Sequence, residues 1–166
     1  MFVSIIMGSK SDIDIVNEAV KVLENFGVKH EVIVSSAHRS GERTAKYVKE
    51  SEAKGAGVFI CVAGMAAHLA GVVASLTTKP VLGVPATGGA LNGLDALYST
   101  VQMPGGIPVG TFAIGKAGAK NAAYQAVQIL ALNSNELTLK LKSDRENMAK
   151  KVAEDSASVE ILLPKE

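Results

Sequence analysis

Three short segments carry side chains suited to binding or proton transfer, and each directly follows an apolar run of strand length. They are Gly8–Asp12, Ser35–Gly41 and Ala63–Leu69. In an open parallel sheet, ligands bind beyond the carboxyl ends of the strands, where the strand order reverses. If the three preceding runs are neighbouring parallel strands, these segments meet at one edge of the sheet. We therefore expect a single site there.

The first segment combines a glycine turn with the hydroxyls of Ser9 and Ser11 and the carboxylate of Asp12. Free backbone N–H groups and the helix dipole make the start of a helix an anion site, suited to phosphate. Asp12 is better suited to hold ribose hydroxyls. The alternative is ordinary helix capping, because Ser9 followed by Asp12 also forms a capping box.

The second segment contains His38 and Arg39, preceded by Ser36 and Ala37. An imidazole changes charge near neutral pH, so His38 can both give and take a proton. The planar guanidinium of Arg39 matches the oxygens of a phosphate or a carboxylate. The alternative is a pair of solvated surface side chains.

The third segment adds small residues and a second histidine to an otherwise apolar wall. Ala63 and Gly64 are small, and His68 precedes Leu69. A lone histidine on an apolar face is more often hydrogen-bonded structure than chemistry. A structural role is therefore the simpler interpretation of His68, and also of His30.

The elements that hold these segments alternate between strand and helix patterns, which is typical of βαβ units on a parallel sheet. Five strands are predicted, at 2–7, 31–35, 58–62, 80–84 and 109–114. Helices are predicted at 13–26, 42–54, 66–76, 94–102 and 117–132. For five such units the common strand order is 2-1-3-4-5. We expect a three-layer α/β core over 1–133 within a single domain.

The chain beyond Asn133 is different in composition. A lysine- and glutamate-rich amphipathic helix is predicted at 136–155. The tail from Ser156 contains the run Val159–Leu163, which is too apolar for a free end. We expect this tail to pack on the same subunit or a neighbouring one, and residues 134–166 to form a C-terminal extension of the core.

Charged residues are nearly absent from the middle of the chain. Between Gly55 and Gly115 only Lys79 and Asp95 are charged, 2 of 33 formal charges. A solvated monomer surface needs more charge, so we expect burial by other subunits in an obligate homo-oligomer. The uncharged run 55–78 is long enough to span a bilayer, but its glycines, hydroxyls and division into a strand and a helix argue against a membrane span.

Composition excludes several classes of function. A net charge of +1 offers no basic surplus for nucleic acid. The single Cys61 excludes an internal disulfide, and the three histidines lack metal-ligand spacing. Gly110–Ala117 nearly matches a P-loop, but Ala117 stands where a magnesium-binding hydroxyl is needed. The first residues lack a basic leader, so a cytoplasmic protein is expected.

The three polar segments, together with three later motifs, resemble the N5-carboxyaminoimidazole ribonucleotide mutase family of purine biosynthesis. The later motifs are Pro80–Pro85, Gln102–Thr111 and Ala113–Gly118. The similarity covers residues 3–133. It implies a flavodoxin-like subunit of a homo-octamer that acts on a ribonucleotide without a cofactor or a metal.

The resemblance also implies roles for single residues. The ribose phosphate would be bound by Ser9, Ser11, Asp12 and Arg39. The pocket for the base and its carboxylate would be lined by Ser36, Ala37, Ala63, Gly64, His68 and Leu69. His38 would be the general acid and base. The family reaction moves a carboxylate from the exocyclic nitrogen of an aminoimidazole ring to ring carbon C4.

The residue chemistry fits that reaction. Protonation of the carbamate nitrogen by His38 would release CO2, and a small, dry pocket would keep the CO2 beside C4. After C4 attacks the CO2, the same histidine would remove the C4 proton. One imidazole would thus close the cycle.

Two other functions stay open. One is a related carboxylase that uses free CO2 and the decarboxylated ribonucleotide, although that branch has lysine where this chain has Arg39. The other is a non-catalytic flavodoxin-like carrier of FMN, although flavin sites favour aromatic side chains and the chain has no Trp. The chain departs from the family pattern at Ile13, Gly41 and Ala70, which predicts weaker substrate binding rather than altered chemistry.

Overall fold

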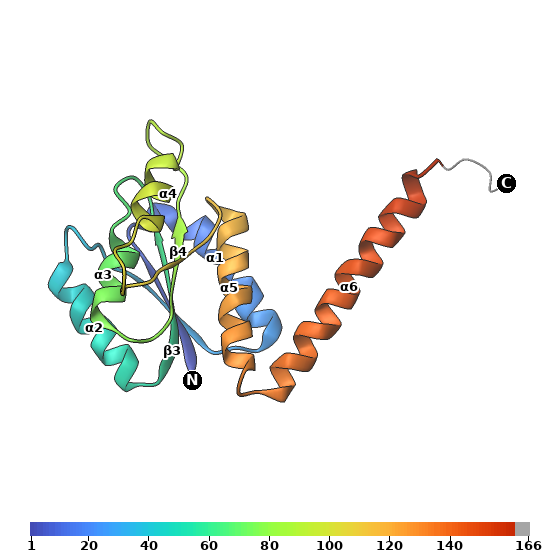
Figure 1. Ribbon diagram of the computed structural model, residues 1–166, viewed down its shortest axis with the longest axis horizontal. Coiled ribbons are helices and arrows are strands. Elements are labelled where there is room, and N and C mark those ends of the chain that lie inside the picture. The colour runs from blue at the N-terminus through green and yellow to red at the C-terminus, as the bar shows by residue number, and fades with distance from the viewer. Residues whose placement is uncertain (162–166) are drawn as a thin grey trace.

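A computed structural model describes residues 1–161 and shows a twisted parallel sheet with helices on both faces (Figure 1). Its strands are β1 (Phe2–Met7), β2 (His30–Val34), β3 (Ala56–Ala63), β4 (Val81–Pro85) and β5 (Gly110–Thr111). Their order is 2-1-3-4-5, and all neighbouring strands are parallel. The predicted three-layer, flavodoxin-like α/β fold and its strand order are confirmed.

The helices are a short 3-10 helix η1 (Lys10–Asp12), α1 (Ile13–Phe26), α2 (Gly41–Ala53), α3 (Leu69–Leu76), α4 (Leu94–Val101), α5 (Lys116–Ala131) and α6 (Asn135–Val159). Helices α1 and α5 cover one face of the sheet, and α2 and α3 cover the other. Strands β3 and β4 consist of nonpolar residues, and β1 is nonpolar except for the buried Ser4, as is typical of strands with both faces buried.

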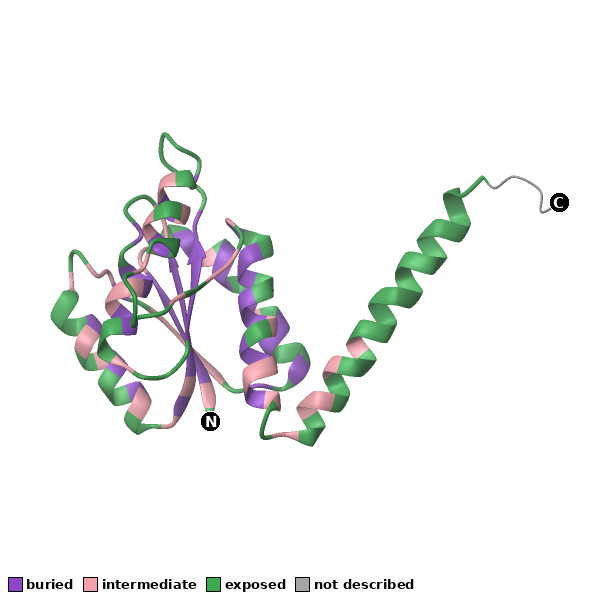
Figure 2. Cartoon of the chain, viewed as in Figure 1, coloured by how far each residue is buried: buried purple, intermediate pink, exposed green. Residues whose placement is uncertain are grey.

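The core consists of two clusters, one on each face of the sheet (Figure 2). Alternate residues of a strand point to opposite faces. In β3, Ile60 therefore packs toward α1 and α5, whereas Phe59 and Cys61 pack toward α2 and α3. This double anchoring fixes β1 and β3, and with them the loops that follow at their carboxyl ends.

Two predicted boundaries are wrong for local reasons. The helix predicted from Ala66 begins at Leu69, because the N–H groups of Ala67 and His68 bond to carbonyls only two residues back. The strand predicted at 109–114 contains only Gly110 and Thr111. Beyond them, Phe112 and Gly115 still donate to carbonyls of β4, but at irregular spacing.

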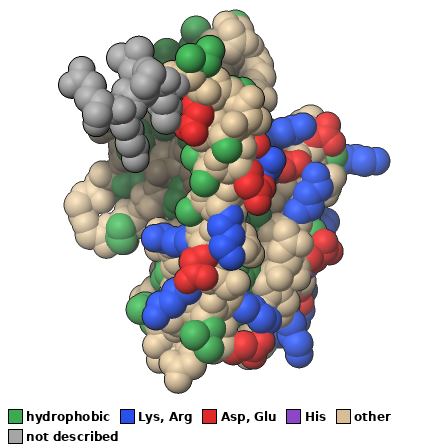
Figure 3. All heavy atoms as spheres, turned by 90° about the vertical axis from the view of Figure 1, so that its right-hand side faces the viewer, with side chains coloured by type: hydrophobic (Ala, Val, Ile, Leu, Met, Phe, Trp, Pro, Cys, Tyr) green, Lys and Arg blue, Asp and Glu red, His purple; other side chains and the backbone are tan. Residues whose placement is uncertain are grey.

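Helix α6 leaves the body of the subunit at an angle (Figure 1). Leu137 and Leu141, in its first turns, pack against the core, but none of its described residues is buried. Ile161 is 97% exposed. Packing of the tail on its own subunit is therefore wrong for residues 156–161, and residues 162–166 lie outside the described part. The outer side of α6 carries mixed positive and negative side chains (Figure 3).

Within residues 1–161, no helix combines the length and the apolar character that a bilayer crossing requires.

Candidate functional site

A cavity of about 540 Å³ opens beyond the carboxyl ends of β1 and β3, where the strand order reverses. This volume is typical of a small-molecule site. All eleven sequence-predicted site residues line it: Ser9, Ser11, Asp12, Ser36, Ala37, His38, Arg39, Ala63, Gly64, His68 and Leu69. The topology thus brings the three polar segments together, as expected.

The first and third segments touch at the floor of this cavity. The N–H of Gly8 donates to the carbonyl of Val62 at 2.9 Å. A methyl group placed on Gly8 would lie 3.6 Å from Cβ of Ala63. That is an ordinary van der Waals distance, so Gly8 packs the first segment closely against the end of β3.

The predicted capping box in the first segment is confirmed. The N–H of Ser11 donates to Oγ of Ser9 at 3.3 Å, and the N–H of Ser9 donates to Oδ2 of Asp12 at 3.2 Å. The hydroxyl of Ser11 also lies 2.9 Å from that of Ser9. Capping fixes the direction of these groups at the cavity wall. Their role in binding stays a prediction.

Asp12 is the buried carboxyl of the site, with 8% of its surface exposed. Burial raises its pKa above the ordinary value of 3.8, against the opposing effect of the hydrogen bonds from Ser9 and Ser11. The folded protein therefore binds this proton more tightly than the unfolded chain does. The resulting stabilisation is complete below pH 3.8 and is lost as the pH rises through the folded-state pKa.

The first prediction follows from that sign. Asp12→Asn removes the buried charge but keeps an oxygen that can accept from the N–H of Ser9. We expect the difference in Tm, Asp12→Asn minus parent, to be larger at pH 7 than at pH 4. Thermal unfolding of both proteins at the two pH values measures it. Asp14→Asn, at an exposed position in the following turn, is the matched control. A relative Tm for Asp12→Asn that does not depend on pH would contradict the prediction.

Arg39 links the second segment to the first. Its Nη2 donates to the carbonyl of Gly8 at 3.3 Å, and its Nε and backbone N–H donate to Oγ of Ser36 at 3.4 and 3.2 Å. The hydroxyl of Ser40 in turn accepts from the N–H of Ser36 at 3.0 Å. The guanidinium is therefore held beside the capped turn of the first segment. A positive group and exposed hydroxyls form one end of the cavity.

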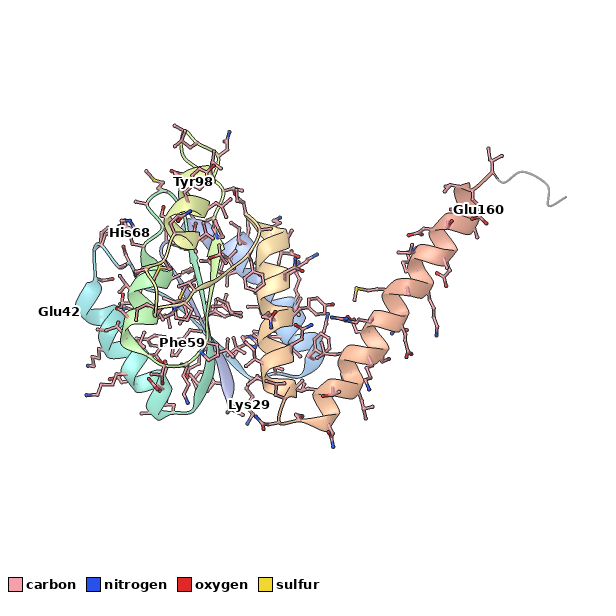
Figure 4. The ribbon with its side chains drawn as sticks, in the orientation of Figure 1. Lys29, Glu42, Phe59, His68, Tyr98 and Glu160 are labelled. Atoms are coloured by element: carbon pink, nitrogen blue, oxygen red, sulfur yellow. The ribbon has the colours of Figure 1, made fainter. Side chains whose placement is uncertain are left out.

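His38 and His68 form a pair at the cavity wall. Nε2 of His38 lies 2.8 Å from Nδ1 of His68, and the rings meet edge to face with centroids 4.9 Å apart. A single hydrogen lies between the two nitrogens, so one ring donates while the other accepts. Figure 4 shows His68 at the same end of the sheet as Tyr98, far from Lys29, which precedes β2. Sequence reasoning placed both histidines at the site but did not foresee their contact.

Sequence reasoning missed one wall of the cavity. Thr87, Gly88 and Gly89, in the loop after β4, line the cavity, as do Met65 and Ala66 beside His68. The strand order could have indicated Thr87, Gly88 and Gly89. Strand β4 is the neighbour of β3, so the loop at its carboxyl end reaches the same edge of the sheet.

Two other features contribute no polar group to the cavity. Cys61 is buried in the sheet, and burial raises the pKa of its thiol. In residues 1–161, no three His, Cys, Asp or Glu side chains cluster closely enough to hold a metal ion. The ionisable side chains that line the cavity are those of Asp12, His38, Arg39 and His68.

Comparison with known proteins shows the family of the chain. The family described as AIR carboxylase matches residues 2–151. The chain belongs to this family. It is 50% identical over 158 residues to the N5-carboxyaminoimidazole ribonucleotide mutase of Pyrococcus horikoshii, a match covering 95% of this chain and 88% of that protein. The Escherichia coli K12 protein of the same name is 49% identical over 153 residues, covering 92% and 90%.

A solved member of the family has the same fold. The crystal structure of Treponema denticola PurE superposes with a TM-score of 0.88 at 30% sequence identity, covering 96% of this chain and 99% of that chain. The core before residue 134 makes up only four fifths of the chain, so the superposition extends into α6. The part of this chain that matches the Treponema denticola protein therefore includes residues of α6.

Proposed function

We propose that this chain is an N5-carboxyaminoimidazole ribonucleotide mutase of purine biosynthesis, forming 4-carboxy-5-aminoimidazole ribonucleotide. The observation that carries the proposal is the imidazole pair, held 2.8 Å apart in a cavity whose other end presents Arg39 and two serine hydroxyls. Such a cavity can hold a phosphate at one end and transfer a proton at the other. Relatives of this name are about half identical over more than nine tenths of the chain.

The ribose phosphate is assigned to the Arg39 end. The guanidinium already contacts the first loop through the carbonyl of Gly8, and the hydroxyls of Ser9 and Ser11 face the same cavity. Asp12 stands beside them as an acceptor for ribose hydroxyls.

Proton transfer is assigned to His38. The base and its carboxylate occupy the part of the cavity lined by Ser36, Ala37, Ala63, Gly64, His68 and Leu69. His38 protonates the carbamate nitrogen, the N–C bond breaks, and CO2 is released. C4 then forms a bond to the CO2 and returns its proton to His38. His68 shares one hydrogen with His38, so it orients the ring and fixes which nitrogen is free for substrate.

The small residues of the third segment provide space in which CO2 can be held between the two steps. A methyl group on Gly64 would lie 3.6 Å from Cβ of Ala86, an ordinary van der Waals distance, so the missing side chain of Gly64 leaves room there. Ala63 and Ala37 add apolar surface, and no charge intervenes. Holding CO2 beside C4 replaces a bimolecular encounter with a local one.

The test separates this reaction from carboxylation by free CO2. At low bicarbonate, we expect rapid conversion of N5-carboxyaminoimidazole ribonucleotide and slow conversion of aminoimidazole ribonucleotide, followed by the absorbance of the product. The reverse preference would identify the carboxylase instead. The same assay at high bicarbonate is the control, because it supplies CO2 to both substrates.

The proposal includes a cytoplasmic homo-oligomer, with an octamer as the state implied by the family resemblance. Two groups of exposed apolar side chains support association. One lies around α4 and contains Leu94, Tyr98 and Val101. The other, on α6, contains Met148, Val152 and Val159. Large apolar patches of this kind mark interaction surfaces.

A further inference from the structure

Met65 has an unusual backbone conformation for its residue type. Its φ is +56°, and in the described chain the only other non-glycine residue with positive φ is Asn92, at +51°. A side chain with a Cβ is disfavoured in this left-handed region, which glycine adopts freely. The neighbours of Met65 hold it there. Its carbonyl accepts from the N–H of Ala67 at 2.8 Å and from the hydroxyl of Ser99 at 3.3 Å.

The side chain of Met65 lies at the rim of the cavity. It lines the cavity, yet 64% of its surface is exposed. A methyl group built on Gly89 would lie 3.5 Å from Cγ of Met65. The methionine therefore extends from the loop after β3 to the Gly88–Gly89 turn after β4. It lies between these two walls, which are also joined below it by the hydrogen bond from the N–H of Ala86 to the carbonyl of Ala63 at 2.8 Å.

We propose that Met65 closes the rim of the cavity and retains the CO2 formed during the reaction. This inference rests on the proposed function. The thioether side chain is apolar and flexible, so it can cover the opening without binding substrate by a polar contact. A disfavoured backbone conformation at a binding site is a reason to look for a role of the side chain it carries. Retention of a neutral, apolar intermediate is a role that methionine fills and glycine does not.

The chemistry defines what leakage would look like. When the N–C bond of the carbamate breaks, its electron pair stays on nitrogen, which takes a proton from His38, and CO2 is free. If CO2 remains, C4 bonds to it and the C4 proton returns to His38. If CO2 escapes, aminoimidazole ribonucleotide is left as a by-product. After subtraction of the by-product that forms without enzyme, the ratio of by-product to product therefore measures retention.

The experiment uses Met65→Gly with substrate labelled by ¹³C at the carboxylate, in unlabelled bicarbonate. We expect Met65→Gly to turn over substrate with a Tm at or above that of the parent, because glycine relieves the backbone. We expect loss of label and by-product formation to rise by about threefold or more, because trapping depends on local concentration. Met65→Leu, which restores apolar volume, should return both to the parent level.

The matched control is Asn92→Gly. It relieves the same kind of backbone conformation in the neighbouring loop, at an exposed residue that does not line the cavity. It should retain label as the parent does. A Met65→Gly variant that turns over and retains label as well as the parent would overturn the inference alone. A parent chain that does not convert the labelled substrate would overturn the proposed function and this inference together.

Discussion

His38→Asn is expected to abolish turnover while leaving ribonucleotide affinity within roughly tenfold, or about 1.4 kcal/mol. Asparagine has a similar reach but cannot exchange a proton near neutral pH. General acid and base catalysis contributes about 10²- to 10⁴-fold, and here one ring performs both transfers. We therefore expect a loss of kcat of at least about a hundredfold. Steady-state kinetics and product binding by calorimetry measure the two quantities separately.

The matched control for that variant is His30→Asn. His30 lies at the beginning of β2, and its Nδ1 is 3.1 Å from the carbonyl of Val28, away from the cavity. This replacement removes an imidazole of the same sheet without touching the site, so turnover should be kept. Retained turnover in His38→Asn would overturn the catalytic assignment. Equal losses in both variants would point to a general effect on folding.

The second large effect is expected on assembly, from Val152→Glu. The apolar residues of α6 at 137, 141, 148, 152 and 159 recur at spacings of 4, 7, 4 and 7. At 3.6 residues per turn they fall within an arc of roughly 60°, so they form one stripe along the helix. Leu137 and Leu141 fix the near end of the stripe against the core, whereas Val152 is 68% exposed in the single chain.

A carboxylate placed in an apolar contact between subunits must be desolvated. We expect Val152→Glu to weaken association by about 2 kcal/mol or more at each contact, roughly thirtyfold in Kd. Light scattering at micromolar protein should show a smaller assembly. The parent chain should be an oligomer under the same conditions. A parent chain that is monomeric would contradict the assembly proposal.

Ala157→Glu is the matched control for assembly. It adds the same charge to the same helix at an exposed position, about 140° around the axis from Val152. The outer side of α6 already carries charged side chains, so this variant should assemble as the parent does (Figure 3). Dissociation by both variants, or by neither, would contradict the assignment of the apolar stripe to the contact.

Sequence patterns predicted the positions of the strands and the place of the cavity because both follow from local rules. Period-two alternation and full apolar runs identify buried strands, and parallel topology sends every βα loop to one edge. The pairing of His38 with His68 was beyond such rules. The two residues are 30 positions apart, and only the juxtaposition of the β2 and β3 loops across β1 brings them to 2.8 Å.

The remaining misses also have physical causes. The carbonyl of Met65 accepts from the hydroxyl of Ser99 in α4, a contact that no local sequence pattern indicates. The helix after it begins at Leu69, three residues later than the predicted start at Ala66. The apolar tail predicted packing on the same subunit or a neighbouring one, and residues 156–161 are exposed on their own subunit. Hydrophobicity shows that a surface is to be covered, but it does not say which chain covers it.

The projecting helix α6 has a thermodynamic consequence. An isolated helical segment in water is marginal, and most helices owe their order to tertiary packing. Beyond Leu141, α6 has little such packing in the single chain. Asp144 still accepts a hydrogen bond from Tyr124 of α5 at 2.9 Å. If association supplies the packing beyond it, the order of residues 145–159 follows mass action, and dilution of the protein melts this part of the helix while the sheet stays folded.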